Sequence, residues 1–392
     1  MNSITISFGI LLVILSLHGA EGRAQEVRVA ETVDRNTTYS INDLSASSPD
    51  QGEFDGSTTM TTTDSFEDCG GPTFSDPCPC VYFQIDALFL QRVPQIASQP
   101  IVVDDSTGTT LLSTSDLNFN FDPGLQATFG WRLCNGRTLE LDYFGLFSGT
   151  ASAVVVSPGP GSFLIFSDNL VGNVFVDVDR VEVDYSSSLH SFAANLLCCC
   201  GCCDSCSSCD SCSSNCGSNS SCQSLSWFAG FRYLNLNEQL DILAQRDELG
   251  GVEEGSYNLQ TSNNLYGGQL GAKLRRTQGR FGWEAMGFGG IFYNDAQQSQ
   301  SVTDFPNFLL RPTVSSRSGG VAFASGANLS AIYALSDVWN LRAGYNLLWL
   351  EGVALAPNQL DFDFADAQGG TRLHDNGSLF LHGANVGLEA RW

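Results

Sequence analysis

The chain has 392 residues, of which 43% are hydrophobic, and it contains 40 glycines and 14 cysteines. Its formal net charge of −24 reflects 42 acidic residues against 18 Lys and Arg. This balance excludes an ordinary nucleic-acid-binding protein, because phosphate binding needs a basic surface. After the N-terminus, no run of about 20 apolar residues predicts a transmembrane helix.

The first 24 residues are expected to be a signal peptide for export. The apolar stretch 4–17 is of the right length, and Gly22 and Ala24 supply small residues before a cleavage point at Gln25. An uncleaved anchor is the alternative, although the stretch is short for a membrane helix. Residues 25–79 are rich in Ser, Thr and Asp, so we expect a disordered leader that cannot bury a core.

The remaining chain shows a repeated period of two. In LNFNFDPGLQATFGWRL (117–133), apolar side chains alternate with polar ones, which is typical of a strand with one apolar face. The same alternation recurs down to the C-terminus. It predicts ten strands, at 81–93, 117–133, 137–149, 185–197, 224–238, 263–276, 280–294, 319–335, 338–352 and 377–392.

Two architectures with such strands are a soluble β-sandwich and an outer-membrane barrel. The tight connections CNGR, TQGR and SD alternate with long ones, as the short periplasmic turns and long outer loops of such barrels do. An even strand number leaves both ends in the periplasm, and the chain ends on the aromatic Trp392. We therefore expect a transmembrane antiparallel up-and-down β-barrel over 80–392, of about 10 strands (10–12). The long connections are 94–116, 150–184, 239–262, 295–318 and 353–376.

A cysteine-rich run at 198–222 falls where this alternation requires a periplasmic turn, so we interpret it as an insertion. In an oxidising compartment, many closely spaced cysteines favour disulfides. The alternatives are a soft-metal site built on the x2 spacings of 203–212 and a low-complexity expansion without a defined role. The disulfide candidates are Cys69, Cys78, Cys80, Cys134, Cys198, Cys199, Cys200, Cys202, Cys203, Cys206, Cys209, Cys212, Cys216 and Cys222.

Four segments carry a resemblance to a known family. VYFQIDALFLQR (81–92), WFAGFRYLNLNEQL (227–240), NNLYGGQLGAKL (263–274) and LRAGYNLLWLEGVALAPNQL (341–360) resemble the putative beta-barrel porin 7 family, in order, over roughly 80–392. The resemblance implies an exported outer-membrane barrel. It implies barrel and location more firmly than transport, and it says nothing about the cysteine run.

The polar faces of the predicted strands should line the lumen. A barrel of about ten strands is narrow, so two hypotheses remain: a plugged lumen whose charges satisfy one another, or a filter for small solutes or ions. We expect membrane lipid and the barrel assembly machinery, acting through the strand that ends at Trp392, as partners. The lumen candidates are Asp86, Asp122, Arg132, Glu140, Asp142, Arg232, Lys273, Arg275, Glu284, Arg342, Glu389 and Arg391.

A catalytic function is not expected, because the chain has no G-x-S-x-G motif. His374 and Asp375 could form an acid/base group with Asp104 and Asp105 only if two outer loops converge. The acidic stretch DFDFAD (361–366) lacks the spacing and glycine of a calcium loop, so a solvated loop is the preferred interpretation. No cofactor is expected.

Overall fold

The computed structural model describes residues 81–93, 98–133, 137–157, 163–166, 175, 177–200, 221–248, 251–306, 308–364, 366 and 368–392. The expected signal peptide, the expected leader and the cysteines at 69–80, 134 and 202–216 lie outside the described residues. Within the described part, no helix is long and apolar enough to cross a membrane.

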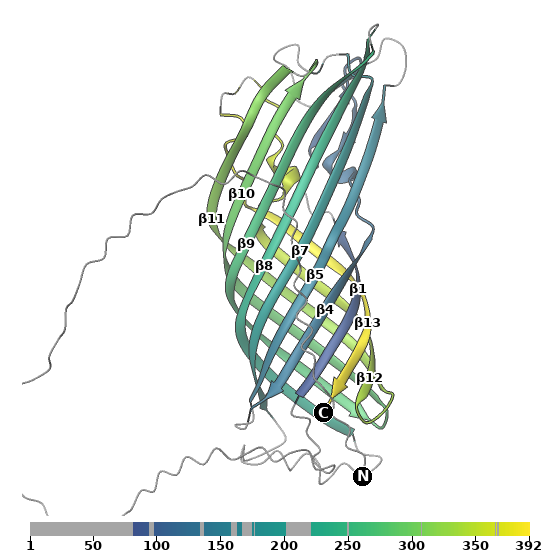
Figure 1. Cartoon of the computed structure of the whole chain (residues 1–392), viewed down its shortest axis with the longest axis vertical. Helices are drawn as coiled ribbons and strands as arrows, with labels where there is room; N and C mark the ends of the chain where they lie inside the picture. Colours follow the sequence, from purple (N-terminus) through teal and green to yellow (C-terminus); the bar gives the residue numbers. More distant parts are fainter. Residues whose placement is uncertain are drawn as a thin grey trace, which may run out of the picture. The chain divides into compact units, whose positions relative to one another are not determined.

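Ten antiparallel strands close into a barrel (Figure 1). Each strand pairs with its neighbours in the chain, and β1 closes the ring by pairing with both β4 and β13. The predicted fold class and strand number are confirmed, and the alternative of a soluble sandwich is wrong. The strands of the ring are β1 (Val81–Val93), β4 (Phe121–Arg132), β5 (Arg137–Val156), β7 (Arg180–Cys200), β8 (Ser221–Glu248), β9 (Gly251–Gln278), β10 (Phe281–Asp304), β11 (Phe308–Ala334), β12 (Trp339–Val353) and β13 (Gly377–Arg391).

The barrel wall extends further on one side, where β5 and β7 to β11 are longer than the sequence predicts (Figure 1). We call this part the tall wall. The predicted loops 239–262 and 295–318 are wrong, since β8 and β9, and likewise β10 and β11, remain paired almost to their tips. The predicted loop 150–184 is shortened in the same way by β5 and β7.

The strands of the tall wall reverse their polarity along their length. On β8, Trp227 and Phe231 point outward with 56% and 54% of their surface exposed, whereas Leu240 and Ile242 point inward and are buried. The period of two continues, but the apolar face changes sides. A search for one continuous amphipathic strand ends where the apolar face changes sides. The sequence therefore predicts loops in these segments.

The lower part of the barrel presents an apolar band to its surroundings. Trp131, Trp227 and Trp339 lie near the periplasmic ends of their strands and are about half exposed. Towards the outer end, Tyr233, Tyr266 and Tyr293 are direct neighbours across β8, β9 and β10, and we call them the tyrosine row. An outward apolar band flanked by aromatic residues is typical of outer-membrane barrels.

The long connections after β1, β5 and β12 contain small elements of their own. They are β2 (Pro100–Asp104), β3 (Thr110–Ser113), the 3-10 turn η1 (Thr114–Asp116), β6 (Leu164–Phe166) and the 3-10 turn η3 (Ala356–Gln359). The three short strands form one sheet in the order β3-β2-β6. We call these elements and their connections the loop layer, because they pack on the inner face of the tall wall.

The chain leaves β12 through a bulge at Gly352, between Glu351 and Val353. Gly352 has a φ of 82°, and a Cβ there would lie 2.7 Å from the carbonyl oxygen of Val321. We expect Gly352→Ala to lower the free energy of unfolding by about 1–3 kcal/mol, because a side chain at this φ is strained. Urea unfolding followed by tryptophan fluorescence measures this. Gly289→Ala is the control, since its Cβ would meet nothing within 4 Å, and equal losses would contradict the prediction.

Candidate functional site in the barrel lumen

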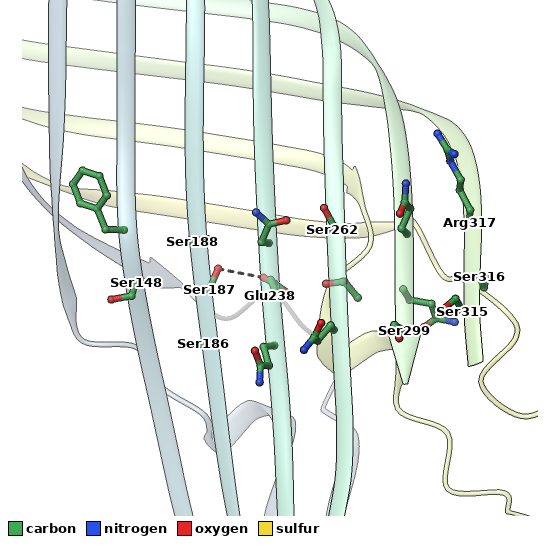
Figure 2. Close-up of a pocket in the computed structure, with 17 residues that line it drawn as sticks. Ser148, Ser186, Ser187, Ser188, Glu238, Ser262, Ser299, Ser315, Ser316 and Arg317 are labelled. Atoms are coloured by element: carbon green, nitrogen blue, oxygen red, sulfur yellow. Dashed lines mark hydrogen bonds between the residues drawn. The ribbon is translucent and has the colours of Figure 1, made fainter. Parts of the chain in front are cut away.

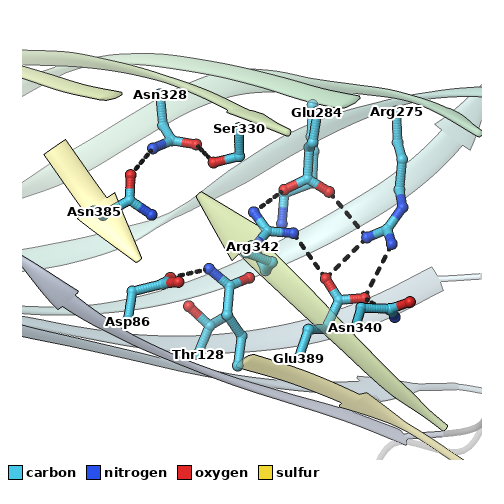
Figure 3. A network of polar contacts seen from close by, with 12 residues as sticks. Asp86, Thr128, Arg275, Glu284, Asn328, Ser330, Asn340, Arg342, Asn385 and Glu389 are labelled. Atoms are coloured by element: carbon cyan, nitrogen blue, oxygen red, sulfur yellow. Dashed lines mark hydrogen bonds and ion pairs between the residues drawn. The ribbon is translucent and has the colours of Figure 1, made fainter. Parts of the chain in front are cut away.

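A network of buried ion pairs crosses the periplasmic half of the lumen (Figure 3). At its centre, the guanidinium of Arg342 on β12 lies 2.9 Å from Glu284 on β10 and 2.7 Å from Glu389 on β13. Arg275 on β9 binds the same two carboxylates, at 3.3 Å and 3.0 Å. Arg391 also contacts Glu389. Two carboxylates thus hold three guanidinium groups from separate strands inside the barrel.

A second group of charges lies beside the first. The ammonium of Lys273 is 2.6 Å from Glu140, which also accepts a hydrogen bond from the Tyr82 hydroxyl. Arg232 is 3.9 Å from Asp142 and donates a 2.7 Å hydrogen bond to the side chain of a glutamine on β9. The guanidinium of Arg232 also stacks 4.3 Å from the ring centroid of a phenylalanine on β10. These groups link β1, β5, β8 and β9.

We call these two groups together the charged layer. Its carboxylates are Asp86, Glu140, Asp142, Glu284 and Glu389. Its cations are Arg232, Lys273, Arg275, Arg342 and Arg391. The two signs are equal in number, so the layer is close to neutral. A cavity of about 30 Å³ remains inside it, which has room for about one water molecule.

The other two sequence-predicted lumen residues lie outside this network. Arg132 is half-buried at the periplasmic end of β4, and Asp122 is half-buried at the outer end of the same strand. Asp86 is fully buried and accepts a hydrogen bond from Gln84 within its own strand. The structure therefore brings most of the predicted lumen charges together and leaves the two β4 residues at the rims.

An apolar layer fills the lumen above the charges. Nine of the ten barrel strands contribute to it, and only β4 does not. We call it the leucine layer; its buried members are Leu88, Leu90, Phe144, Leu146, Leu189, Leu234, Leu236, Leu265, Phe292, Ala322, Ala324, Leu348, Leu350, Val353, Leu355, Leu379 and Leu381. Side chains that are buried on strands all around a ring can only meet inside it. The alternation alone does not predict this layer, because these leucines lie on the face that it assigns to polar residues.

The loop layer closes the lumen above the leucines, and a buried ion pair holds it to the wall. Arg92 on β1 lies 2.6 Å from Glu238 on β8, and the two side chains are 3% and 0% exposed. The other carboxylate oxygen of Glu238 accepts a 2.8 Å hydrogen bond from the backbone N–H of Ala356 in η3. One glutamate therefore joins two barrel strands and the loop layer.

Further polar contacts fix the connection after β12. Asn263 on β9 donates a 2.8 Å hydrogen bond to the carbonyl of Ala354 and accepts one of 2.7 Å from its N–H. The guanidinium of Arg311 on β11 donates to the carbonyls of Asp361 and Asp363, each at 3.2 Å. The carboxylate of Asp361 accepts hydrogen bonds from nearby backbone N–H groups. The acidic stretch thus packs through its main chain against the barrel.

The residues considered for catalysis form hydrogen bonds with different partners. The backbone of His374 exchanges hydrogen bonds with the side chain of Gln359, and Asp375 accepts a 3.2 Å hydrogen bond from Ser318 on β11. Asp104 accepts hydrogen bonds from Ser106 within its own turn. Among the described residues, no group of His, Cys, Asp and Glu is arranged to hold a metal ion.

The cysteine run begins within the barrel wall instead of after it. β7 continues to Cys200, and Cys198 pairs in register with Trp227 of β8. The side chain of Cys198 is exposed on the outer face, and among the residues that the structure describes it has no disulfide partner. Cys198 shares the outward parity of the wall residues around it. Cys199, Cys200 and Cys222 are described only as strand residues.

Several solved structures show weak similarity to this chain. A deletion mutant of the monoaromatic hydrocarbon channel TodX has 8% identity and a TM-score of 0.21, covering 81% of this chain and 91% of its own. A Pseudomonas aeruginosa FadL homologue has 7% identity and a TM-score of 0.22, with coverages of 80% and 89%. An anion-selective porin from Comamonas acidovorans has 11% identity and a TM-score of 0.14, with coverages of 80% and 99%.

No curated protein matches this chain significantly. A protein-family model does: the family described as "Putative beta barrel porin-7" matches residues 86–392, which include all of the barrel except the first residues of β1. The match agrees with the closed ring of strands. The chain therefore belongs to the family described as putative beta barrel porin-7.

Proposed function

We propose that this outer-membrane barrel is sealed in its resting state and serves mainly to hold the tall wall and the loop layer at the cell surface. The leucine layer is the observation that carries the proposal. A hydrophobic constriction excludes water and so blocks ions and polar solutes. Because nine strands of the wall itself supply the layer, no movement of the loops alone would remove it.

The charged layer supports the same proposal. A solute passing through it would have to separate ion pairs such as Arg342–Glu389, in which both side chains are 2% exposed. Removing one partner from such a pair leaves an uncompensated buried charge, which costs about 3–5 kcal/mol. The sequence left a selectivity filter and a satisfied network as alternatives, and the number of mutual contacts favours the satisfied network.

Conductance in planar lipid bilayers tests the proposal. We expect the folded full-length protein to insert without producing single-channel steps, with heat-modifiable gel migration as proof that the barrel is folded. A steady open-channel current from the native protein would contradict a sealed resting state.

A gated porin for small solutes is the second candidate function, and the construction of the loop layer favours it. The layer belongs to connections between strands, so it can leave the lumen without breaking the barrel. Replacing 354–376 by a two-residue turn between Val353 and Gly377, which are neighbours across β12 and β13, removes η3 and its connection. Steps that appear only in this variant would favour the gated porin. Silence would mean that the wall, together with the remaining β2, β3 and β6, keeps the lumen closed without η3.

We also propose two partners and no catalysis. The outward apolar band would contact membrane lipid. The barrel assembly machinery would recognise β13 before the ring closes, together with the following Trp392, whose backbone exchanges two hydrogen bonds with that of Val81 in β1. The His374 and Asp375 region has structural hydrogen bonds on both residues, which supports a non-enzymatic loop.

A further inference from the structure

A shallow hollow lies on the outer surface of the tall wall (Figure 2). Its volume is about 610 Å³, and β5 and β7 to β11 all contribute to it. Two adjacent cross-strand rows form its floor, and in each row every residue is the direct neighbour of the next. The lower row is Ser188, Asn237, Ser262, Gln297 and Arg317.

The upper row of the hollow is uniformly neutral and polar. It consists of Ser186, Gln239, Gln260, Ser299 and Ser315. Hydroxyl and carboxamide side chains both donate and accept hydrogen bonds. A ligand whose own groups do the same, such as the hydroxyls of a saccharide, would match this surface.

The charges at the hollow exclude a phosphate as the main ligand. Arg317 is the only cation among the lining residues, all of which the structure describes. Its guanidinium forms two hydrogen bonds with Asp295, at 2.6 Å and 2.5 Å. A surface that recognises phosphate needs cationic side chains that are free to bind it. At one edge of the hollow, Phe147 is 53% exposed and offers an aromatic face to the apolar side of a sugar ring.

The height of the hollow identifies where such a saccharide would come from. Asn237 is four residues beyond Tyr233 of the tyrosine row, which corresponds to about 13 Å along a strand. With a strand tilt of about 45°, the hollow lies about 9 Å above that row. The polar headgroup region extends only about 5–8 Å beyond the hydrocarbon on each side. Phospholipid headgroups therefore end below the hollow, whereas the sugars of a glycolipid reach it.

We propose that this hollow binds the saccharide headgroup of a glycolipid in the outer leaflet. Neutral amides and hydroxyls on five strands bind the sugar hydroxyls, while the acyl chains lie against the apolar band below. The barrel would thereby be anchored laterally to a specific lipid. This assignment depends on the outer-membrane orientation and is independent of whether the lumen conducts.

The test uses full-length protein in vesicles of phosphatidylethanolamine with and without rough-type lipopolysaccharide. After detergent extraction and purification, mass spectrometry measures the glycolipid retained per protein. The variant Asn237→Ala/Gln260→Ala/Gln297→Ala removes three amides from the hollow. Because each neutral hydrogen bond contributes modestly, we expect retention to fall about tenfold. The control Ser152→Ala/Asn258→Ala changes exposed, outward polar residues of the tall wall outside the hollow and should retain the native amount.

Heat-modifiable migration must be the same in all three proteins, so that retention compares folded barrels. Equal retention by the native protein and the triple variant would overturn the proposal. Equal retention of phosphatidylethanolamine and lipopolysaccharide would also overturn it, because the sugar would then make no difference. If the lipid-free oligosaccharide of the same lipopolysaccharide competes fully at equal concentration, the site binds a soluble saccharide and the glycolipid assignment is wrong.

Discussion

Arg342→Met is expected to destabilise the barrel by about 3–5 kcal/mol, because it removes one partner from a buried network. The methionine keeps most of the apolar volume, so the loss reports mainly on charge. Glu284 would then keep only the Arg275 guanidinium among its described ion pairs, whereas Glu389 would keep Arg275 and Arg391. Urea titration of the detergent-folded protein, followed by tryptophan fluorescence and by heat-modifiable migration, measures the change.

Two further variants make this prediction specific to burial. Arg317→Met breaks the exposed ion pair with Asp295 on the outer surface and should leave the unfolding midpoint unchanged. Adding Glu284→Gln to Arg342→Met removes one of the two carboxylates that lost the Arg342 guanidinium, and it should recover part of the loss. If the double variant is as unstable as the sum of both single variants, the network is not electrostatically coupled.

The lower half of the fold could be predicted from the sequence, because there the apolar residues of each strand mostly face outward and the polar residues mostly face inward. On strands such as β8 and β12, Trp227 and Trp339 face outward while Arg232 and Arg342 face inward, and each polarity keeps a fixed parity. The ten strands and the lumen positions of most charges follow from this parity alone. Which carboxylate each cation binds does not follow, because it depends on strand neighbours and on lengths of side chains across the ring.

The upper half could not be predicted, because two physical environments succeed one another on the same strand. Above the tyrosine row, the outward side chains of the tall wall are mostly polar and the loop layer packs on its inner face, so Leu240 and Ile242 point inward and are buried. The contacts that hold this part together join residues far apart in sequence. Arg92 and Glu238 are separated by 146 positions, and Asn263 and Ala354 by 91. No local pattern records such pairs.

The three lumen layers differ in whether they belong to the barrel wall or to the connections between its strands. The charged layer and the leucine layer belong to the wall, so they can change only if strands move apart and lose their ladder hydrogen bonds. The loop layer belongs to connections, and it packs on the tall wall through a buried apolar cluster. Among its polar contacts is the hydrogen bond from Ala356 to Glu238, whose carboxylate is also paired with Arg92 and fully buried.

Glu238→Ala is accordingly expected to cost about 3–5 kcal/mol, because it leaves the Arg92 guanidinium buried without its carboxylate. It also removes the acceptor of the Ala356 N–H, so the connection 354–376 should become sensitive to external protease in proteoliposomes. Glu182→Ala, which breaks a largely exposed pair with Arg180, is the matched control and should stay resistant.

The double variant Arg92→Leu/Glu238→Leu separates the effect of the buried charges from that of the hydrogen bond between Glu238 and Ala356. Apolar residues that replace a whole buried pair often restore stability, because no charge then remains to be desolvated. We expect the double variant to recover most of the lost stability while the connection remains protease-sensitive, since the hydrogen bond to Ala356 is still absent. Recovery of both stability and protease resistance would mean that packing alone holds the loop layer. The hydrogen bond from Ala356 to Glu238 would then not be needed to keep the connection in place.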